Sequence, residues 1–146
     1  MSRIPDERPL NPKPEVVDGL RRLLPRASVL TTEAELAPYE CDGLSAFQQR
    51  PLVVALPETV EQVQAVMRLC HEMEVPVVAR GAGTGLSGGA LPLADGVLLS
   101  LAKFNRILGI DPANRSATVQ PGVRNLAISE AAAGHGLYYA PDPSSQ

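Results

Sequence analysis

Residues 52–90, LVVALPETVEQVQAVMRLCHEMEVPVVARGAGTGLSGGA, decide the fold. Two short apolar runs, residues 52–55 and 75–79, are typical of strands, and Pro57 ends the first of them. A strand–helix–strand order predicts a parallel β-α-β unit. The β-branched residues in both runs predict a sheet that is covered on both of its faces.

The helix between the two strands has a sequence signature at its start. Thr59 and Gln62 have the spacing of a capping box, with Thr59 as the N-cap residue. From there the apolar residues recur with helical periodicity as far as about Glu74. The spacing therefore predicts a helix that begins just after Thr59 and ends near Glu74.

The flanking sequence divides the chain into three parts. Four prolines among residues 1–15 predict a flexible N-terminal arm. Residues 16–50 are expected to form a helix and a lead-in segment, and residues 51–146 the main domain.

Within that domain the pattern predicts further strands and one more helix. The strands are expected at residues 96–101, 107–110 and 116–120, and the helix at about 124–133, with Gly134 as its C-cap. The expected fold class is α+β with an α/β subdomain, in which helices flank a parallel or mixed sheet.

Composition excludes several functions. The net charge is −3, Trp is absent and aromatic residues make up 3%, which argues against a nucleic-acid partner. The first residues lack the apolar segment of a secretory signal, and no stretch is long enough for a transmembrane helix, so a cytoplasmic location is expected. The two Cys and two His residues stand singly, so we expect reduced thiols and no metal site.

The glycine-rich loop that follows residues 75–79 does not fit two common phosphate-binding motifs. A Walker A loop ends in Lys-Ser/Thr, and this loop contains no lysine. Residues 83–88 match G-x-G-x-x-G, but no helical run starts before Pro92, and the acidic residue expected about 20 positions later is missing. Neither an NTPase nor a Rossmann site is supported.

A long glycine loop after a strand still offers a way to bind an anion. Successive backbone N–H groups can surround a phosphate, and glycine allows the backbone to approach closely. Thr84 and Ser87 add hydroxyl donors, and Arg80 is expected to balance phosphate charge. The structural alternative is a mobile surface loop.

Two of these segments resemble a known family. PETVEQV at residues 57–63 and RGAGTGLSG at residues 80–88 are similar to the strand–helix–strand unit and the pyrophosphate loop of FAD-binding domains of the vanillyl-alcohol-oxidase or p-cresol-methylhydroxylase (PCMH) type. The resemblance implies the PCMH-type FAD-binding fold.

Four segments resemble, more narrowly, the FAD-linked D subunits of bacterial glycolate oxidases. They are YECDGLS at 39–45, RGAGTGLSGGA at 80–90, PGVRNL at 121–126 and YYAPDPSSQ at 138–146. The similarity runs from about Val29 to Gln146. Because this family continues beyond the matched part, we expect the chain to be an N-terminal fragment whose FAD-binding domain is incomplete.

The resemblance implies a set of cofactor-binding residues. The expected FAD contacts are Arg80, Gly81, Ala82, Gly83, Thr84, Gly85, Leu86, Ser87, Gly88, Gly89, Pro121, Gly122, Pro141, Asp142, Pro143, Ser144 and Ser145. Relatives with covalent flavin have a histidine at the position of Thr84, so noncovalent FAD is implied.

Other polar residues are given no catalytic role. His71 is expected on a helix surface and His135 beside a helix C-terminus. Tyr39 and Asp42 remain open, because either residue fits a position near the cofactor and Asp42 also fits a turn cap. Within these residues we expect no catalytic group and no metal ligand.

The implied function is oxidation of a small 2-hydroxy acid, glycolate to glyoxylate, with D-lactate as the competing substrate. A hydride would pass to FAD. Electrons would leave through other glycolate oxidase subunits, including an iron–sulfur subunit, and the resemblance leaves open a peripheral membrane association through such partners. The fragment alone is expected to be inactive. The alternative is a non-catalytic FAD- or nucleotide-binding module, or a truncated remnant of such an enzyme.

Overall fold

The computed structural model describes residues 14–141. The helices are α1 (Pro14–Leu23), α2 (Glu33–Leu36), α3 (Val60–Glu72) and α4 (Asn125–Ala132), and short 3-10 turns lie at Arg26–Ser28, Ala37–Tyr39 and Ala133–His135. The strands are β1 (Val29–Leu30), β2 (Val53–Ala55), β3 (Val77–Arg80), β4 (Val97–Ser100), β5 (Ile107–Asp111) and β6 (Ser116–Val119).

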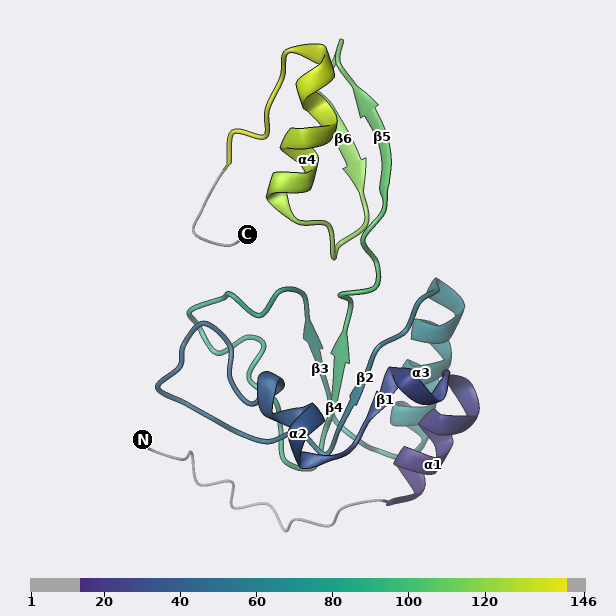
Figure 1. The fold of residues 1–146 in the computed structure, drawn as a ribbon. Helices are drawn as coiled ribbons and strands as arrows, with labels where there is room; N and C mark the ends of the chain where they lie inside the picture. Colours follow the sequence, from purple (N-terminus) through teal and green to yellow (C-terminus); the bar gives the residue numbers. More distant parts are fainter. Residues whose placement is uncertain (1–13, 142–146) are drawn as a thin grey trace.

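Strands β1 to β4 form one mixed sheet in the order β1-β2-β4-β3 (Figure 1). Strand β1 pairs antiparallel with β2, whereas β2 and β3 both pair parallel with β4. The predicted β-α-β unit is therefore present, but its two strands are not neighbours. Strand β4 lies between them and supplies the hydrogen bonds to both.

Helix α3 begins where the capping signature places it. The Thr59 side-chain oxygen accepts a hydrogen bond from the Gln62 N–H at 3.2 Å. In a capping box the Gln62 side chain would accept a hydrogen bond from the Thr59 N–H. Here it accepts from the N–H of the preceding residue, Glu58, at 2.7 Å. The helix ends at Glu72, close to the predicted boundary.

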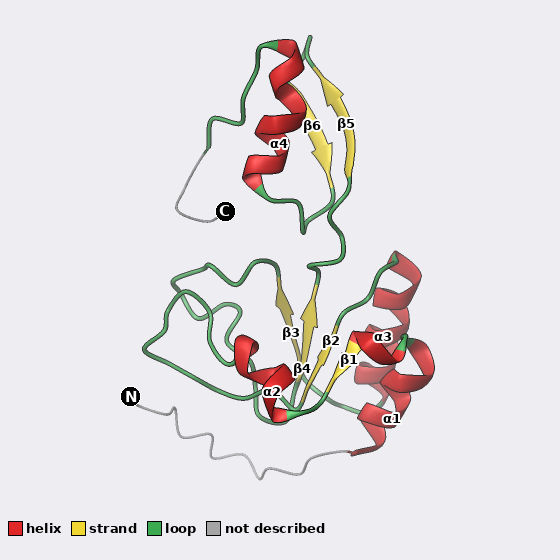
Figure 2. Cartoon of the chain, in the orientation of Figure 1, coloured by secondary structure: helices red, strands yellow, loops and turns green. Residues whose placement is uncertain are grey.

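Helices and loops cover both faces of this sheet, as the apolar strands predict (Figure 2). On one face α1 and α3 pack against β2 and β4, and the buried residues there include Val16, Leu20, Val53, Val66, Cys70 and Val97. On the other face Leu36, Val54, Leu56 and Leu98 form a smaller cluster. Burial of these apolar side chains is the main stabilising term for the sheet.

Strands β5 and β6 form a separate antiparallel hairpin, beside which α4 lies (Figure 1). None of the hairpin residues is fully buried, and Ile128 and Ala132 are the buried residues of α4. After α4 the chain makes a 3-10 turn that ends at Gly136, whose φ is 67°. The predicted C-cap, Gly134, is thus wrong by two residues, because the chain continues through this extra turn.

The structure describes only the last two residues of the predicted N-terminal arm, residues 1–15. Residues 1–13 of the predicted arm lie outside the described residues, and residues 14 and 15 already belong to α1. In the described part of the chain, no helix is both long and apolar enough to cross a membrane.

Candidate cofactor-binding site

The glycine loop leaves the sheet at the C-terminal end of β3 and contains no helix, as predicted. Gly83 and Gly88 have φ values of 73° and 74°, which side chains with a Cβ rarely adopt. At Gly83 an added Cβ would also collide with the Arg80 guanidinium. The loop conformation therefore favours glycine at both positions, and at Gly83 an added Cβ would also have to displace the Arg80 guanidinium.

The Arg80 side chain packs against the lead-in segment. Its Nη1 donates a hydrogen bond to the carbonyl oxygen of Cys41 at 2.7 Å, and its guanidinium lies 5.6 Å from the centre of the Tyr39 ring. A cation above an aromatic ring is held by the charge distribution of the ring. Arg80 therefore ties the start of the glycine loop to residues 39–41.

Gly43 of the lead-in segment lies against the loop, and Asp42 fixes the turn that contains Gly43. An added Cβ at Gly43 would lie 2.5 Å from the Thr84 carbonyl oxygen, so the two backbones are in close contact. Asp42 Oδ1 accepts the Leu44 N–H at 2.9 Å, which confirms that Asp42 caps a turn. Its Oδ2 is buried without a hydrogen-bond partner in the described residues, so an acceptor next to the loop remains unused.

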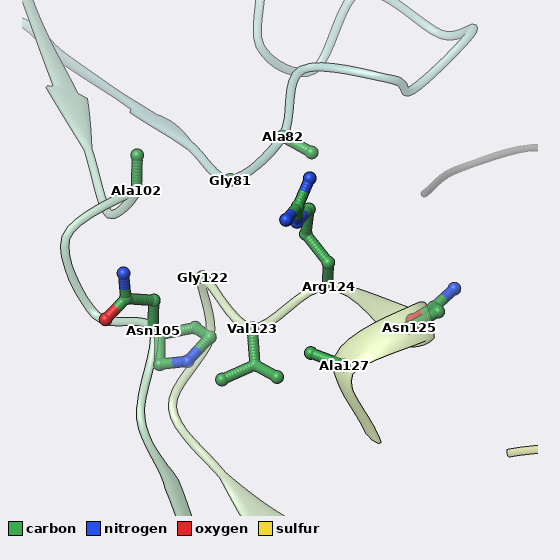
Figure 3. A pocket seen from close by; sticks show the side chains of 10 residues that line it. Gly81, Ala82, Ala102, Asn105, Gly122, Val123, Arg124, Asn125 and Ala127 are labelled. Carbon is green, nitrogen blue, oxygen red and sulfur yellow. The ribbon is translucent and has the colours of Figure 1, made fainter. Parts of the chain in front are cut away.

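A cavity of about 590 Å³ lies between the glycine loop and the start of α4 (Figure 3). Its lining comes from the connections after β3, after β4 and after β6, and from the first turn of α4. The residues are Gly81, Ala82, Ala102, Asn105, Pro121, Gly122, Val123, Arg124, Asn125 and Ala127. The cavity is of the size that binds small molecules and cofactors in other proteins.

The Pro121-Gly122 turn is fixed against the β4–β5 connection. The Gly122 N–H donates to the Phe104 carbonyl oxygen at 2.7 Å. An added Cβ at Gly122 would collide with the Leu101 carbonyl oxygen, so this close approach requires glycine. The turn places the residues that follow it on the wall opposite the glycine loop.

Arg124 is the charged residue among those that line the cavity in the described part of the chain. Figure 3 shows its side chain extending across the cavity towards Ala82. Arg124 is also the N-cap residue of α4, so the positive end of that helix faces the same space. Sequence reasoning quoted Arg124 in a motif but did not assign it to the site, although a cation directly before a helix start was the available signal.

The structure brings together only some of the residues predicted to bind the cofactor. Gly81, Ala82, Pro121 and Gly122 line the cavity, whereas the lining does not include Arg80, Pro141 or the loop from Gly83 to Gly89. The segment from Asp142 to Ser145 lies outside the described residues. These assignments stay predictions.

The two histidines lie where the sequence places them. His71 is exposed in the last turn of α3, and His135 is exposed in the turn after α4. Neither lines the cavity.

The residues present fit a phosphate-bearing cofactor. One wall has small residues and exposed backbone, and the other has a cationic side chain and a helix N-terminus. Backbone N–H groups and a guanidinium are donors that suit phosphate oxygens.

Comparison with known proteins identifies the family. The family described as FAD binding domain matches residues 51–146. The chain belongs to the FAD binding domain family. The predicted PCMH-type fold is confirmed by p-cresol methylhydroxylase with substrate bound, which is 31% identical with a TM-score of 0.74 over 85% of this chain and 25% of that one. The 4-ethylphenol oxidase from Gulosibacter chungangensis is 27% identical with a TM-score of 0.77, over 91% of this chain and 26% of that one.

Curated relatives confirm the narrower resemblance. Glycolate oxidase subunit GlcD of Escherichia coli (strain K12) is 63% identical over 131 residues, which are 90% of this chain and 26% of that protein. D-lactate dehydrogenase of Anaerostipes hadrus is 34% identical over 134 residues, 91% of this chain and 28% of the relative. The chain thus spans about a quarter of the length of the curated relatives that it matches.

Proposed function

We propose that this chain is the FAD-binding part of an enzyme that oxidises a small 2-hydroxy acid. The observation that carries the proposal is the cavity between Gly81–Ala82 and Gly122–Arg124, which lies within an FAD binding domain. The 63% identity to a glycolate oxidase subunit supports glycolate as the substrate and glyoxylate as the product.

The chain's own residues bind and orient the cofactor in this proposal. Backbone N–H groups of residues 81–89 donate to the pyrophosphate, and Thr84 and Ser87 add hydroxyl donors. Thr84 has no nucleophilic ring nitrogen, so FAD is held noncovalently. When bound, FAD supplies a ring that accepts a hydride from the substrate carbon.

D-lactate is the competing substrate, because it differs from glycolate by one methyl group. A relative that is named a D-lactate dehydrogenase is 34% identical. One methyl group changes binding in a pocket by about 1–3 kcal/mol. Glycolate is favoured here by the higher identity to the glycolate oxidase subunit.

Other subunits complete the proposed reaction path. The word subunit in the name of the glycolate oxidase relative supports assembly with partner chains. We propose that electrons leave FAD through such partners, including an iron–sulfur subunit, and that the assembly is cytoplasmic, with any membrane contact made through partners.

The direct test is a titration of FAD against this chain and against the intact protein that carries it, followed by flavin fluorescence and thermal unfolding. At 100 times Kd, binding raises the free energy of unfolding by about 2.7 kcal/mol. Glycolate then reduces the flavin of the intact protein, observed as bleaching of its visible absorbance. FAD binding without bleaching by glycolate or D-lactate would support a non-catalytic binding module instead, and absence of FAD binding by the folded intact protein would contradict the proposal.

Gly83→Val tests the loop within this proposal. The substitution places a β-branched residue at a φ of 73° and against the Arg80 guanidinium, so we expect loss of FAD from the purified intact protein. The measurement is flavin per protein by absorbance. Gly134→Val is the control, since an added Cβ there has no neighbour within 4 Å. Full flavin content in Gly83→Val would remove this glycine from the proposed site.

A further inference from the structure

We infer that Arg124 is the side chain that pairs with the phosphate groups of FAD, and that Arg80 is a positioning residue that holds the glycine loop in place. This inference rests on the proposed function, because it assigns roles within the same cofactor site. It reverses the expectation from the sequence, in which Arg80 balances the phosphate charge.

Arg80 is already engaged by the protein. Its guanidinium donates to the Cys41 carbonyl oxygen at 2.7 Å and lies against the Tyr39 ring. It also occupies the space into which a Cβ at Gly83 would extend. These contacts place the guanidinium against the segment that supports the loop, and Arg80 does not line the cavity.

Arg124 is in the opposite situation. It is exposed, and its guanidinium makes no hydrogen bond or ion pair within residues 14–141. Figure 3 shows the side chain directed across the cavity towards Ala82, where the glycine loop begins. Its backbone is fixed at the start of α4, where its carbonyl oxygen accepts the Ile128 N–H at 3.3 Å. The backbone of Arg124 is therefore held in place, while its guanidinium faces the loop without a partner in the described residues.

The charge on this wall suits a pyrophosphate. A pyrophosphate that bridges two nucleoside-like groups carries two negative charges. The Arg124 guanidinium supplies one full positive charge, and the N-terminus of α4 adds about half a charge on the same side. The glycine loop contributes no charged side chain to the cavity lining, so the two walls contribute differently: the loop supplies uncharged donors at close range and Arg124 supplies charge.

The first experiment measures the Kd of FAD for the intact protein at several NaCl concentrations. For Arg124→Gln we expect about 10- to 100-fold weaker binding near 0.1 M salt, since hydrogen bonds to charged groups are lost. The difference from wild type should shrink as salt screens the interaction. Arg124→Lys keeps the charge and should recover most of the affinity.

Arg115→Gln is the matched control. Arg115 is exposed in the turn between β5 and β6, so its replacement removes the same charge from the same part of the chain without reaching the cavity. We expect its Kd and salt dependence to equal those of wild type. If Arg124→Gln has an unchanged Kd and an unchanged salt dependence, the phosphate role of Arg124 is wrong.

The second experiment separates the role of Arg80 by measuring thermal unfolding without FAD. Arg80→Gln and Arg80→Lys should both lower the unfolding temperature and weaken FAD binding, while the remaining binding keeps the wild-type salt dependence. Lysine does not restore the contacts, because it lacks the planar guanidinium. Arg124→Gln should leave the FAD-free unfolding temperature unchanged.

The outcomes distinguish this inference from the proposed function. If the folded wild-type protein does not bind FAD, the proposed function fails. If wild type binds FAD and the salt dependence is lost in the Arg80 variants but kept in Arg124→Gln, the roles assigned to the two arginines are overturned while the proposed function stands.

Discussion

The two walls of the cavity belong to parts of the molecule that differ in how they are stabilised. The sheet unit, residues 14–101, has fully buried strands β2 and β4 and helices packed on them. The hairpin unit, residues 107–141, has strands without one fully buried residue and a helix with two. A two-stranded hairpin with so little burial has marginal stability in water.

The two walls of the cavity are held in place by different contacts. The glycine loop is backed by the lead-in segment of the sheet unit, so its wall is built before any ligand binds. The wall that carries Arg124 depends on the hairpin unit and on the Gly122 contact with the β4–β5 connection. A ligand that contacts both walls therefore stabilises mainly the hairpin unit.

The largest expected effect is that of Leu98→Ala in β4. Leu98 is 0% exposed, so its truncation leaves a cavity and should cost about 2–5 kcal/mol of unfolding free energy. Leu108→Ala is the matched change in β5, where the side chain is 59% exposed, and should stay within about 0.5 kcal/mol. Urea unfolding followed by circular dichroism measures both. Equal costs would contradict the contrast between the two units.

A smaller effect is expected for Gly43→Ala, which tests the backing of the loop. The added methyl carbon would lie 2.5 Å from the Thr84 carbonyl oxygen and 2.8 Å from that of Gly85. Backbone must move to accommodate it, at a cost of about 1–3 kcal/mol. Gly85→Ala is the control for thermal unfolding, because its Cβ has no neighbour within 4 Å. If both variants have the unfolding temperature of wild type, the lead-in segment does not support the loop.

Cysteine alkylation compares local opening of the two units. In a Cys41→Ser background, Cys70 reports on the sheet unit, and Ala132→Cys introduces a thiol at a position of α4 that is 7% exposed. Saturating FAD should slow alkylation of the thiol at position 132 by about tenfold or more, because binding suppresses opening of the hairpin unit. The rate at Cys70 should change little. An equal FAD effect at both sites would show that the units open together.

The smallest effect concerns pH and the Cys70 thiol. Burial raises the pKa of Cys70 from 9.0 to about 11. The unfolded chain therefore loses this proton at lower pH than the folded one, so the stabilising contribution is complete below pH 9 and is lost as pH rises towards 11. Urea unfolding at pH 8, 9 and 10 measures the loss, and Cys70→Ala should remove this part of the pH dependence. A pH dependence identical in wild type and variant would contradict it.

Local patterns in the sequence predicted the local elements. The Thr59 cap, the apolar runs at residues 52–55 and 75–79 and the helix-free glycine loop correspond to features that depend on neighbouring residues. The position of β4 between β2 and β3 was not predicted, because pairing between strands far apart in the sequence leaves no local signal.

The directions of the Arg80 and Arg124 side chains could not be predicted from the sequence for the same reason. Both stand in quoted motifs, but the direction of each side chain depends on tertiary contacts. Arg80 is fixed by Cys41, 39 residues away. Arg124 faces Ala82 because the Gly122 turn packs against residues 101–104. Sequence alone assigned charge compensation to the arginine nearer the glycines.

The sheet order has a consequence for the chain as it is synthesised. Translation delivers β1, β2 and β3 before β4, yet in the described residues β3 pairs only with β4, which is the last of the four strands to be made. Until Val97–Ser100 has left the ribosome, β2 and β3 have no parallel neighbour and their unpaired edges stay open. Completion of this sheet is thus timed by a strand about 45 residues downstream of β2, after the glycine loop has already emerged.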